Sequence, residues 1–543
     1  MVSPALFHLW RREFGDYSRR DLQADLVAGL TVAAVALPLA LAFGVASGAT
    51  AAAGLVTAIV AGVLLGALGG APFQISGPTG AMSAVLIVVA GHYGIQGVWV
   101  AGAMAGVLIF LLGLFRMGRV VSYIPSPVIT GFTSGIALII GIGQLDNVLG
   151  THVEGHTTAV EHLAAYARAG ISPNWRAVST AAIVVAVMIV CLRFARRAPG
   201  ALLGVAVATV AAAVLDWNVA TIGEIPRGIV LEQRLVPSML QPELFVGLTL
   251  PAFSIAALGA IESLLCGAVA GTMTGTKMDN NQELVAQGIG NVLLPFLGGV
   301  PATAAIARTS VGVKSGGRTR LVSIIHGLAI LLASLVAAPL IARVPLAALG
   351  GVLLVTAARM NEWETIRFFF HRRLRHAVIA MVVTMLATVA LDLTQAIVIG
   401  VAVSGLVFLR QASLIDIARE PVDAERLRHR GHALESIHPH VQVIYVSGPL
   451  FFGSVTAFLE SLEGVPASDT LILSLRGVPS VDAMGLQAIQ EVIERQHKGG
   501  GEVRLAGVQR AVAARLRQGG ILTELGDERV HWSADQAILA AHA

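Results

Sequence analysis

The sequence is poor in charge and in cysteine. Only 13% of its 543 residues are Asp, Glu, Lys or Arg, about half the proportion that is typical of soluble domains. The whole of Leu26–Phe115 contains none of these four residue types. No soluble core requires so long an uncharged stretch, so we expect a polytopic α-helical membrane protein embedded in a lipid bilayer.

Motifs for catalysis and cofactor binding are also lacking. The two cysteines, Cys191 and Cys266, both lie in apolar segments and indicate no disulfide framework. The sequence has no nucleotide-binding P-loop, metal-ligand cluster or nucleophile triad. His92 and His326 are single histidines, interpreted as loop or interface residues. We therefore expect no ATP-driven pump, no enzyme, no metal and no cofactor.

Hydrophobic residues make up 55% of the chain, and its 59 glycines suit close helix packing in lipid. We expect about fourteen membrane spans, some of them short. The expected spans are Leu26–Phe43, Ala51–Leu68, Gln74–Ala90, Val98–Phe115, Pro127–Leu149, Val178–Phe194, Gly200–Leu215, Pro251–Thr272, Leu284–Leu297, Thr303–Val311, Leu321–Ile341, Leu346–Ala358, Ala377–Leu391 and Ala396–Leu409.

The basic residues cluster in short connections between these spans, which indicates membrane orientation rather than nucleic-acid binding. The pattern predicts a protein of the cell inner (plasma) membrane. Residues 1–25 and the C-terminal domain are expected on the cytoplasmic side. Arg11, Arg12, Arg19 and Arg20 precede the first span without a small-residue cleavage site, so we interpret the N-terminus as a cytoplasmic interfacial helix.

Two spans are interrupted in the same way. Gln74–Ser83 and Gly299–Ser310 each contain an extended or polar piece, a proline and then a half-length helix. Each is the third span of a group of seven, in repeats at about 26–216 and 251–411. Matching interruptions predict inverted repeats with a binding site near the membrane midplane. The alternative is ordinary glycine and proline kinks in complete helices.

The composition changes after the transporter domain, which we place at 26–411. The segment 412–440 is predicted to be a linker, and 441–543 a small α/β domain. The expected strands and helices alternate, and Asp482 is expected to cap a helix. The strands are Val441–Val446, Leu471–Leu475 and Val503–Ala506, and the helices are Ser454–Leu462, Ala483–Arg495 and Val508–Gln518.

Arg308 and Glu262 are the charges that could carry chemistry inside the membrane. Intramembrane charges usually mark transport pathways, because each is costly to insert. Glu262 could bind a proton beside an anion site at Arg308, or the two could form a structural ion pair. Half-helices that begin near Thr79 and Pro301 could direct their N–H groups at an anion. Phe43 could be a pocket wall or face lipid.

At these residues the chain resembles the sulfate permease (SulP) family of anion transporters. The matching motifs are Ala36–Ser47, Ile75–Ala81, Gln282–Asn291 and Ser315–Thr319, and the C-terminal domain resembles STAS domains. The resemblance implies fourteen transmembrane segments as seven-plus-seven inverted repeats. It also implies core and gate domains, an elevator movement and a homodimer.

The same resemblance implies the roles of individual residues. Phe43 and Thr79 would line the substrate site, Ala307 would offer its backbone N–H, and Arg308 would supply positive charge. Glu262 matches the acidic position of the eighth span, where the sodium-coupled bicarbonate members have Asp, with Thr one turn later. This chain has Glu262 and Cys266 there. Because Arg308 would repel sodium, proton coupling through Glu262 is favoured.

The sequence therefore predicts a secondary active transporter of small anions, with no nucleic-acid partner. We expect proton-coupled symport of a fumarate-like dicarboxylate or sulfate. The alternatives are a sodium-coupled bicarbonate transporter, an uncoupled anion exchanger or channel, and a membrane sensor that signals through the C-terminal domain. Phosphorylated STAS domains carry Asp-Ser-Ser-Gly, whereas this chain has Asp482-Ala483-Met484-Gly485 and lacks both hydroxyls.

Overall fold

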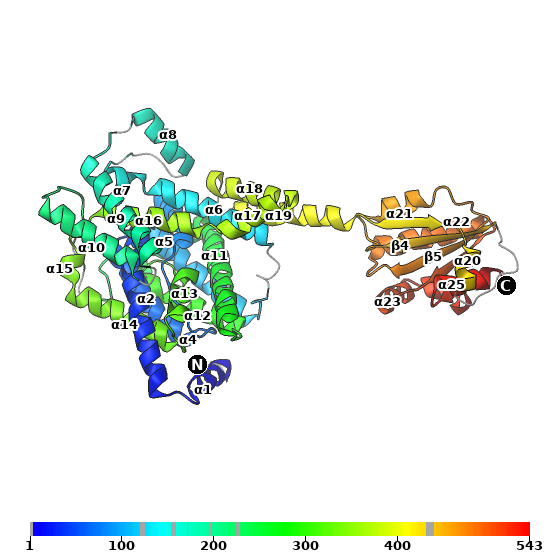
Figure 1. Cartoon of the computed structure of the whole chain (residues 1–543), viewed down its shortest axis with the longest axis horizontal. Helices are drawn as coiled ribbons and strands as arrows, with labels where there is room; N and C mark the ends of the chain where they lie inside the picture. The colour runs from blue at the N-terminus through cyan, green and yellow to red at the C-terminus, as the bar shows by residue number, and fades with distance from the viewer. Residues whose placement is uncertain are drawn as a thin grey trace. The chain divides into compact units, whose positions relative to one another are not determined.

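The computed structural model describes residues 4–119, 125–151, 153, 159–170, 172–195, 198–223, 225, 228–391, 393–429 and 439–542. The chain forms two compact units, Met1–Ala402 and Val403–Ala543. The first is helical and the second is a small α/β domain (Figure 1). Each unit is described by itself below.

The helices of the first half of unit 1 follow the expected spans closely. They are α1 (Pro4–Phe14), α2 (Arg19–Ala46), α3 (Ala51–Val60), the π-helix η1 (Ala61–Leu65), α4 (Gly66–Leu68), α5 (Gly80–Leu114), α6 (Ser126–Gly143), α7 (Leu145–Leu149), α8 (Ala159–Ala169), α9 (Trp175–Phe194) and α10 (Gly200–Val214).

The second half begins after a mostly irregular connection. Its helices are the 3-10 helix η3 (Pro237–Met239), α11 (Pro242–Thr274), α12 (Asn280–Leu293), the 3-10 helix η4 (Leu294–Leu297), α13 (Ile306–Lys314), α14 (Leu321–Val336), α15 (Ala338–Ile341), α16 (Leu346–Met360), α17 (Trp363–His371), α18 (Arg375–Ala390) and α19 (Leu393–Ala412).

Two differences between the helix boundaries and the expected spans are the largest. The third and fourth spans form one helix, α5, whose halves meet at Gly94 with φ 66° and ψ −175°. Glycine tolerates this backbone conformation because it has no Cβ. Helix α11 begins at Pro242, nine residues before the expected start at Pro251. Within the described residues, six helices are long and apolar enough to cross a membrane, and shorter apolar helices accompany them.

Local sequence signals explain where several helices begin. Ser18 and Asp21 form a capping box at the start of α2, in which each side chain bonds the other residue's backbone N–H.

Gly54 on α3 packs against α2 so closely that a Cβ there would overlap the carbonyl oxygen of Ala40. Small residues of this kind let membrane helices approach one another.

Two short strands connect the halves of unit 1. Strand β1 (Ser76–Gly77) pairs antiparallel with β2 (Thr303–Ala304), with Ser76 opposite Ala304. Each strand precedes a helix, α5 and α13 respectively. The interrupted spans therefore come from corresponding places in the two halves and meet in one small sheet.

Unit 2 contains a five-stranded sheet in the order β3-β4-β5-β6-β7. Its elements are β3 (Asp416–Glu420), α20 (Ala424–His429), β4 (Val441–Ser447), α21 (Val455–Ser461), β5 (Thr470–Gly477), α22 (Ala483–Lys498), β6 (Glu502–Ala506), α23 (Arg510–Gln518), α24 (Ile521–Leu525), the 3-10 helix η5 (Asp527–Arg529), β7 (Val530–His531) and α25 (Ala534–His542).

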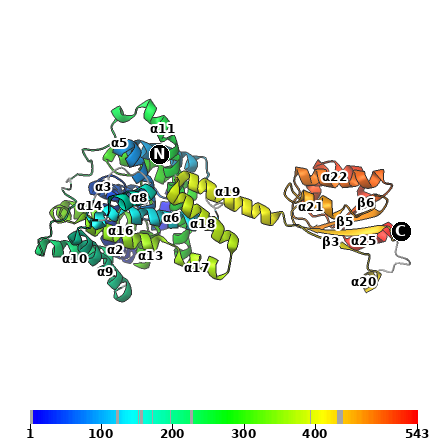
Figure 2. The ribbon, with the colours of Figure 1, turned by 90° about the horizontal axis from the view of Figure 1, so that it is seen from above.

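Strands β4 to β7 are parallel, and β3 runs antiparallel to β4. Helices α21 and α22 cover one face of the sheet, and α25 lies on the other (Figure 1, Figure 2). Strand β3 and helix α20 lie inside the segment 412–440 that the sequence predicted as a linker. The charged composition of Asp416–Glu420 hid this strand, because four of its five side chains are exposed at the sheet edge.

Candidate functional site

The candidate site lies where the two interrupted spans begin their helices. Thr79 is the N-cap of α5, and its hydroxyl accepts a hydrogen bond from the Met82 N–H. Ala305 is the N-cap of α13 and supplies no side-chain cap. The first N–H groups of α13 are therefore left for another acceptor, as helix N-termini require. The hydroxyls of Thr79 and Thr303 lie 3.2 Å apart and bring the two helix starts together.

Arg308 is buried at this junction, with 2% of its surface exposed. Its Nη2 donates to the carbonyl oxygen of Pro78 at 2.5 Å. Its Nη1 is buried without a hydrogen-bond partner among the described residues. A Cβ at position 77 would lie 2.6 Å from that Nη1, so Gly77 provides the space that the guanidinium occupies. The arginine thus bridges the halves and keeps unused donor capacity.

Glu262 lies on α11 and is half-buried. Its Oε2 accepts hydrogen bonds from the hydroxyls of Thr303 at 2.6 Å and Thr79 at 3.0 Å. Within the described part of the chain, Oε1 has no hydrogen-bond partner and no ion pair joins Glu262 to Arg308. The structure thus shows no direct ion pair between these two charges, and each side chain is held by partners of its own.

Phe43 is a buried residue of α2, with 4% of its surface exposed. Its carbonyl oxygen accepts a hydrogen bond from the Ser83 hydroxyl of α5 at 3.1 Å. A Cβ at Gly80 would meet the Phe43 ring, the Ile140 side chain and the Met360 sulfur. Phe43 therefore packs over the first residue of α5 rather than facing lipid. Ile140 and Met360 complete an apolar wall from α6 and α16.

Ala307 occupies the first turn of α13, between the cap Ala305 and Arg308. Its side chain is exposed, whereas Arg308 and Thr309 beside it are buried. The N-terminal turn of α13 is therefore accessible at Ala307. All five predicted residues lie on elements that meet at this junction, since the helix starts connect Thr79, Glu262 and Arg308 and Phe43 packs beside Gly80.

A buried polar network supports β1 and β2 from behind. Glu283 on α12 accepts hydrogen bonds from the Gly70 N–H at 2.9 Å, Gln74 Nε2 at 2.7 Å and Gln287 Nε2 at 2.9 Å. Gln287 Nε2 also donates to the Ser76 hydroxyl of β1 at 2.9 Å. Each buried polar group that is paired in this way avoids a penalty of about 1–3 kcal/mol.

Asn291 holds the other strand from the same helix. Its Nδ2 donates to the Ala302 carbonyl at 2.9 Å, and its Oδ1 accepts from the Ala302 N–H at 2.7 Å. Gln282–Asn291 is one of the motifs that carry the family resemblance, but its sequence alone predicted no role for these side chains. Their helical spacing of four residues (Glu283, Gln287, Asn291) was the available signal for a shared polar face.

Thr303 was also missed as a partner of Glu262, although it begins an interrupted segment. Ile140 and Met360 could not be found from the sequence, because nothing distinguishes them from other apolar residues of long spans. Their position depends on how α6 and α16 pack beside the two half-helices.

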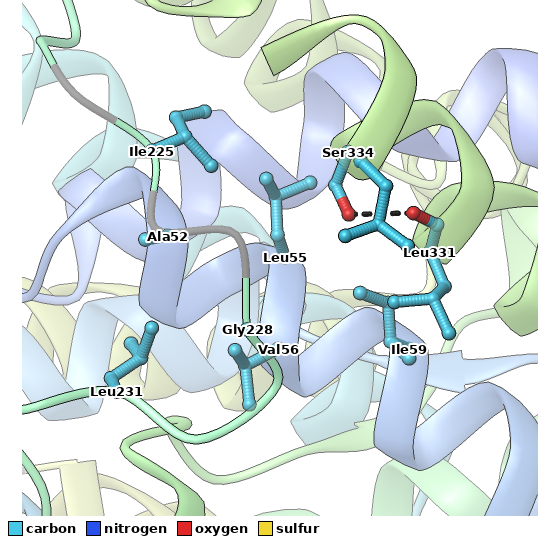
Figure 3. A pocket seen from close by; sticks show the side chains of 10 residues that line it. Ala52, Leu55, Val56, Ile59, Ile225, Gly228, Leu231, Leu331 and Ser334 are labelled. Atoms are coloured by element: carbon cyan, nitrogen blue, oxygen red, sulfur yellow. Dashed lines mark hydrogen bonds between the residues drawn. The ribbon is translucent and has the colours of Figure 1, made fainter.

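A separate crevice lies between α3, residues 225, 228 and 231 of the connection after α10, and α14. Its lining is almost entirely apolar, with Ser334 donating to the Leu331 carbonyl at 2.8 Å (Figure 3). It offers a water-sized sphere only about 10 Å³ of space, which is close to the minimum for one water molecule. It shares no residue with the junction of α5 and α13, so it is not part of the candidate site.

Two half-helices that meet at a buried arginine within a bundle of apolar helices define a membrane transporter for anions. The family model for the sulfate permease family matches residues 22–384, and the STAS domain model matches residues 435–536. The chain belongs to the sulfate permease family. It is an anion transporter and not an enzyme.

The chain is similar to curated proteins of bacteria. It is 35% identical to the putative sulfate transporter YvdB of Bacillus subtilis over 479 residues, covering 85% of this chain and 86% of that protein. It is 32% identical to the bicarbonate transporter BicA of a Synechocystis species over 473 residues, covering 83% of this chain and 82% of that protein.

Solved structures support the fold. The inward-facing murine anion transporter Slc26a9 matches with a TM-score of 0.86 at 21% identity, over 99% of this chain and 94% of that one. The transmembrane domain of BicA matches with a TM-score of 0.62 at 30% identity, over 72% of this chain and 98% of that one. The fold is thus a helical membrane transporter with a C-terminal STAS domain, as the sequence predicted.

Proposed function

We propose that this protein is a secondary active symporter that takes up a small dianion, sulfate or a fumarate-like dicarboxylate, together with protons. The anion binds between the starts of α5 and α13, and the proton binds Glu262. The observation that carries the proposal is the separation of the two charges. Arg308 keeps a free guanidinium nitrogen, while Glu262 is held by hydroxyl groups alone.

The arginine supports recognition of an oxyanion. A guanidinium has five N–H donors and stays charged at neutral pH, which suits carboxylate and sulfate oxygens. One nitrogen is fixed by the Pro78 carbonyl, so the other is held ready rather than free to rotate. The accessible first turn of α13 at Ala307 adds backbone N–H groups and the positive end of the helix dipole.

The hydroxyl partners of Glu262 support reversible protonation. A threonine hydroxyl donates to a carboxylate, but it can turn and accept a hydrogen bond once the carboxyl is protonated. Thr79 and Thr303 can therefore serve both states of Glu262. Glu283 is different, because its three named donors are N–H groups that cannot accept. Of these two carboxyl groups, Glu262 is the one suited to carry a proton.

The fixed charge of Arg308 argues against sodium as the coupling ion, since two positive charges repel in a poorly solvated site. Bicarbonate remains the second candidate cargo, favoured by the 32% identity to a named bicarbonate transporter. We further propose that the half-helices and their supporting helices move together as an elevator, and that the protein is a homodimer. We place the protein in the plasma membrane, with its N-terminus and its STAS domain on the cytoplasmic side.

The test is an uptake panel with purified protein in proteoliposomes. Radiolabelled sulfate, fumarate, succinate, bicarbonate and chloride are offered separately, each with and without an inward proton or sodium gradient. We expect accumulation of one dianion when the outside is more acidic than the inside, and no response to sodium. Uptake that only equalises concentrations would identify an uncoupled exchanger or channel. Sodium-driven bicarbonate accumulation would support the second candidate.

A further inference from the structure

The N-terminal helix α1 lies at one end of the bundle, beneath α4 (Figure 1). The outer face of the following helix α2 carries Leu22, Leu26 and Leu30, which are 48%, 46% and 51% exposed. Leucines repeated every four residues on the outside of a membrane span face lipid. This stripe begins at Leu22. Arg19, Arg20 and α1 therefore lie where lipid headgroups begin.

The free face of α1 matches that environment. Phe7 lies on this face and is 61% exposed. Arg11 and Arg12 on α1 are exposed, and so are Arg19 and Arg20 at the start of α2. Asp16 is the one exposed carboxylate among described residues 6–20. Aromatic and basic residues gathered in this way are typical of helices that lie in the plane of an anionic membrane surface.

The opposite face of α1 is attached to the transporter by a buried ion pair. Glu13 accepts hydrogen bonds from Arg320 Nη2 at 2.6 Å and Nε at 2.9 Å. The side chain of Arg320 is fully buried. Trp10 strengthens the attachment, because its ring lies 5.6 Å from the Arg320 guanidinium and its Nε1 donates to the Ala67 carbonyl.

Arg320 in turn holds the chain that leads to the candidate site. Its Nη1 donates to the carbonyls of Ala67 at 2.8 Å and Gly69 at 3.1 Å. The next residue, Gly70, donates its N–H to Glu283, which also binds Gln74 just before β1. Hydrogen bonds and the Gly69–Gly70 peptide link thus connect α1, through Arg320 and Glu283, to Gln74, two residues before β1.

We propose that α1 binds the headgroups of anionic phospholipids and that the Glu13–Arg320 pair transmits this contact to the substrate site. Lipid contact holds α1 against the bundle, which keeps Arg320 on the carbonyls of Ala67 and Gly69. These carbonyls position the segment that leads into β1. The partner is the membrane surface itself, recognised by its negative charge and by its apolar layer next to Phe7.

The binding half of the proposal is tested without any transport assay. A spin label is placed at Phe7→Cys in the full-length protein, whose native Cys191 and Cys266 are buried. Accessibility to oxygen and to a water-soluble nickel reagent gives its depth in vesicles. In vesicles with about a third phosphatidylglycerol we expect a depth of roughly 5–10 Å below the headgroups. A water-exposed label in these vesicles would overturn the assignment.

Charge is tested with Arg11→Gln/Arg12→Gln, both on the exposed face, where folding is not at risk. We expect roughly thirty-fold weaker binding of labelled α1 to the anionic surface, since two basic contacts are lost. Arg372→Gln/Arg373→Gln, two exposed arginines after α17, is the matched control and should leave the label depth unchanged. Equal depth in all three proteins would contradict a charge-driven contact.

The coupling half rests on the proposed transport function and uses uptake as its readout. We expect the native protein to transport about three-fold or more faster in anionic than in phosphatidylcholine vesicles. Glu13→Gln should bind the surface normally but lose this lipid dependence. Normal label depth with unchanged lipid dependence in Glu13→Gln would refute the coupling. If the native protein transports no panel anion while the depth result holds, the proposed function fails and the lipid contact stands.

Discussion

Arg308 and Glu262 approach the same pair of helix starts from different elements without forming an ion pair. Arg308 donates to the Pro78 carbonyl at 2.5 Å, and Glu262 accepts from Thr79, the next residue. The partner of the cation and a partner of the acid are thus consecutive residues of the chain. A proton and an anion can be bound at adjacent positions here without competing for the same atoms.

Glu262→Gln should abolish proton-driven accumulation and leave substrate exchange at equal concentrations. Glutamine keeps the size of the side chain and an oxygen acceptor for Thr79 and Thr303, but it cannot bind a proton. For one coupled proton without a membrane potential, native accumulation should rise about ten-fold for each pH unit that the outside is more acidic. Accumulation by the variant should stay constant across that range, as measured by radiolabelled uptake.

The matched control is Glu243→Gln, which removes an exposed carboxylate from the first turn of the same helix α11. Its proton-driven accumulation should equal that of the native protein. Full proton coupling in Glu262→Gln, or equal losses in both variants, would remove Glu262 from the coupling mechanism.

Arg308→Lys should weaken substrate binding while the variant remains folded. Lysine keeps one positive charge, but it cannot hold the Pro78 carbonyl and also present a second, fixed nitrogen to an anion. We expect KM for the transported dianion to rise roughly ten-fold or more, the effect of losing one charged hydrogen bond of about 1.5–3 kcal/mol. An unchanged KM would show that the free Nη1 does not contact the substrate.

Gly77→Ala should displace the guanidinium. The new Cβ would lie 2.6 Å from Nη1 of Arg308, where no carbon atom can remain. Overpacking of this kind costs about 1–3 kcal/mol, so we expect a lower unfolding temperature as well as reduced uptake. Gly141→Ala on α6 is the control, since nothing lies within 4 Å of a Cβ there. Equal uptake by the two variants would contradict the tight fit at Gly77.

Asp482→Ala should loosen the start of α22 in the STAS domain. Its Oδ1 accepts from the Gly485 N–H at 2.8 Å, and its Oδ2 accepts from the Phe452 N–H at 3.0 Å. Loss of an N-cap costs about 1 kcal/mol. Hydrogen exchange on the full-length protein should therefore accelerate roughly five-fold at residues 483–486, and Asp482→Asn should restore part of the protection. Unchanged exchange would mean that the cap contributes no local stability.

Much of the fold could be predicted because membrane spans are coded by composition. An uncharged stretch such as Leu26–Phe115 must satisfy its backbone hydrogen bonds within the protein, and most of it does so as helices. Prolines and glycines marked the two interrupted spans, and their equal positions in the two halves indicated a shared site. Strand β3 escaped prediction because its exposed charged residues gave no apolar alternation.

The site could be predicted only in part. A single charge in an apolar span is conspicuous, which made Glu262 and Arg308 visible from the sequence. Whether they touch depends on the rotation of α11 against α13, and no local pattern sets that angle. The same limit hid Met360, which reaches Gly80 only through the packing of α16. The sequence can therefore show an unusual charge, but identifying the residues that it contacts requires the three-dimensional structure.

The pairing of β1 with β2 has a mechanical consequence. Beyond the strand pair itself, the Ala305 N–H donates to the Ile75 carbonyl at 2.9 Å, and the Ile75 N–H donates to the Thr309 hydroxyl at 3.0 Å. Pulling the two half-helices apart would break all of these bonds, whose residues Ile75, Thr303, Ala304 and Thr309 are buried. The starts of α5 and α13 therefore cannot move apart from each other to open the site. In the proposed mechanism the anion must therefore pass beside the strand pair, next to Phe43, Ile140 and Met360, which surround Gly80.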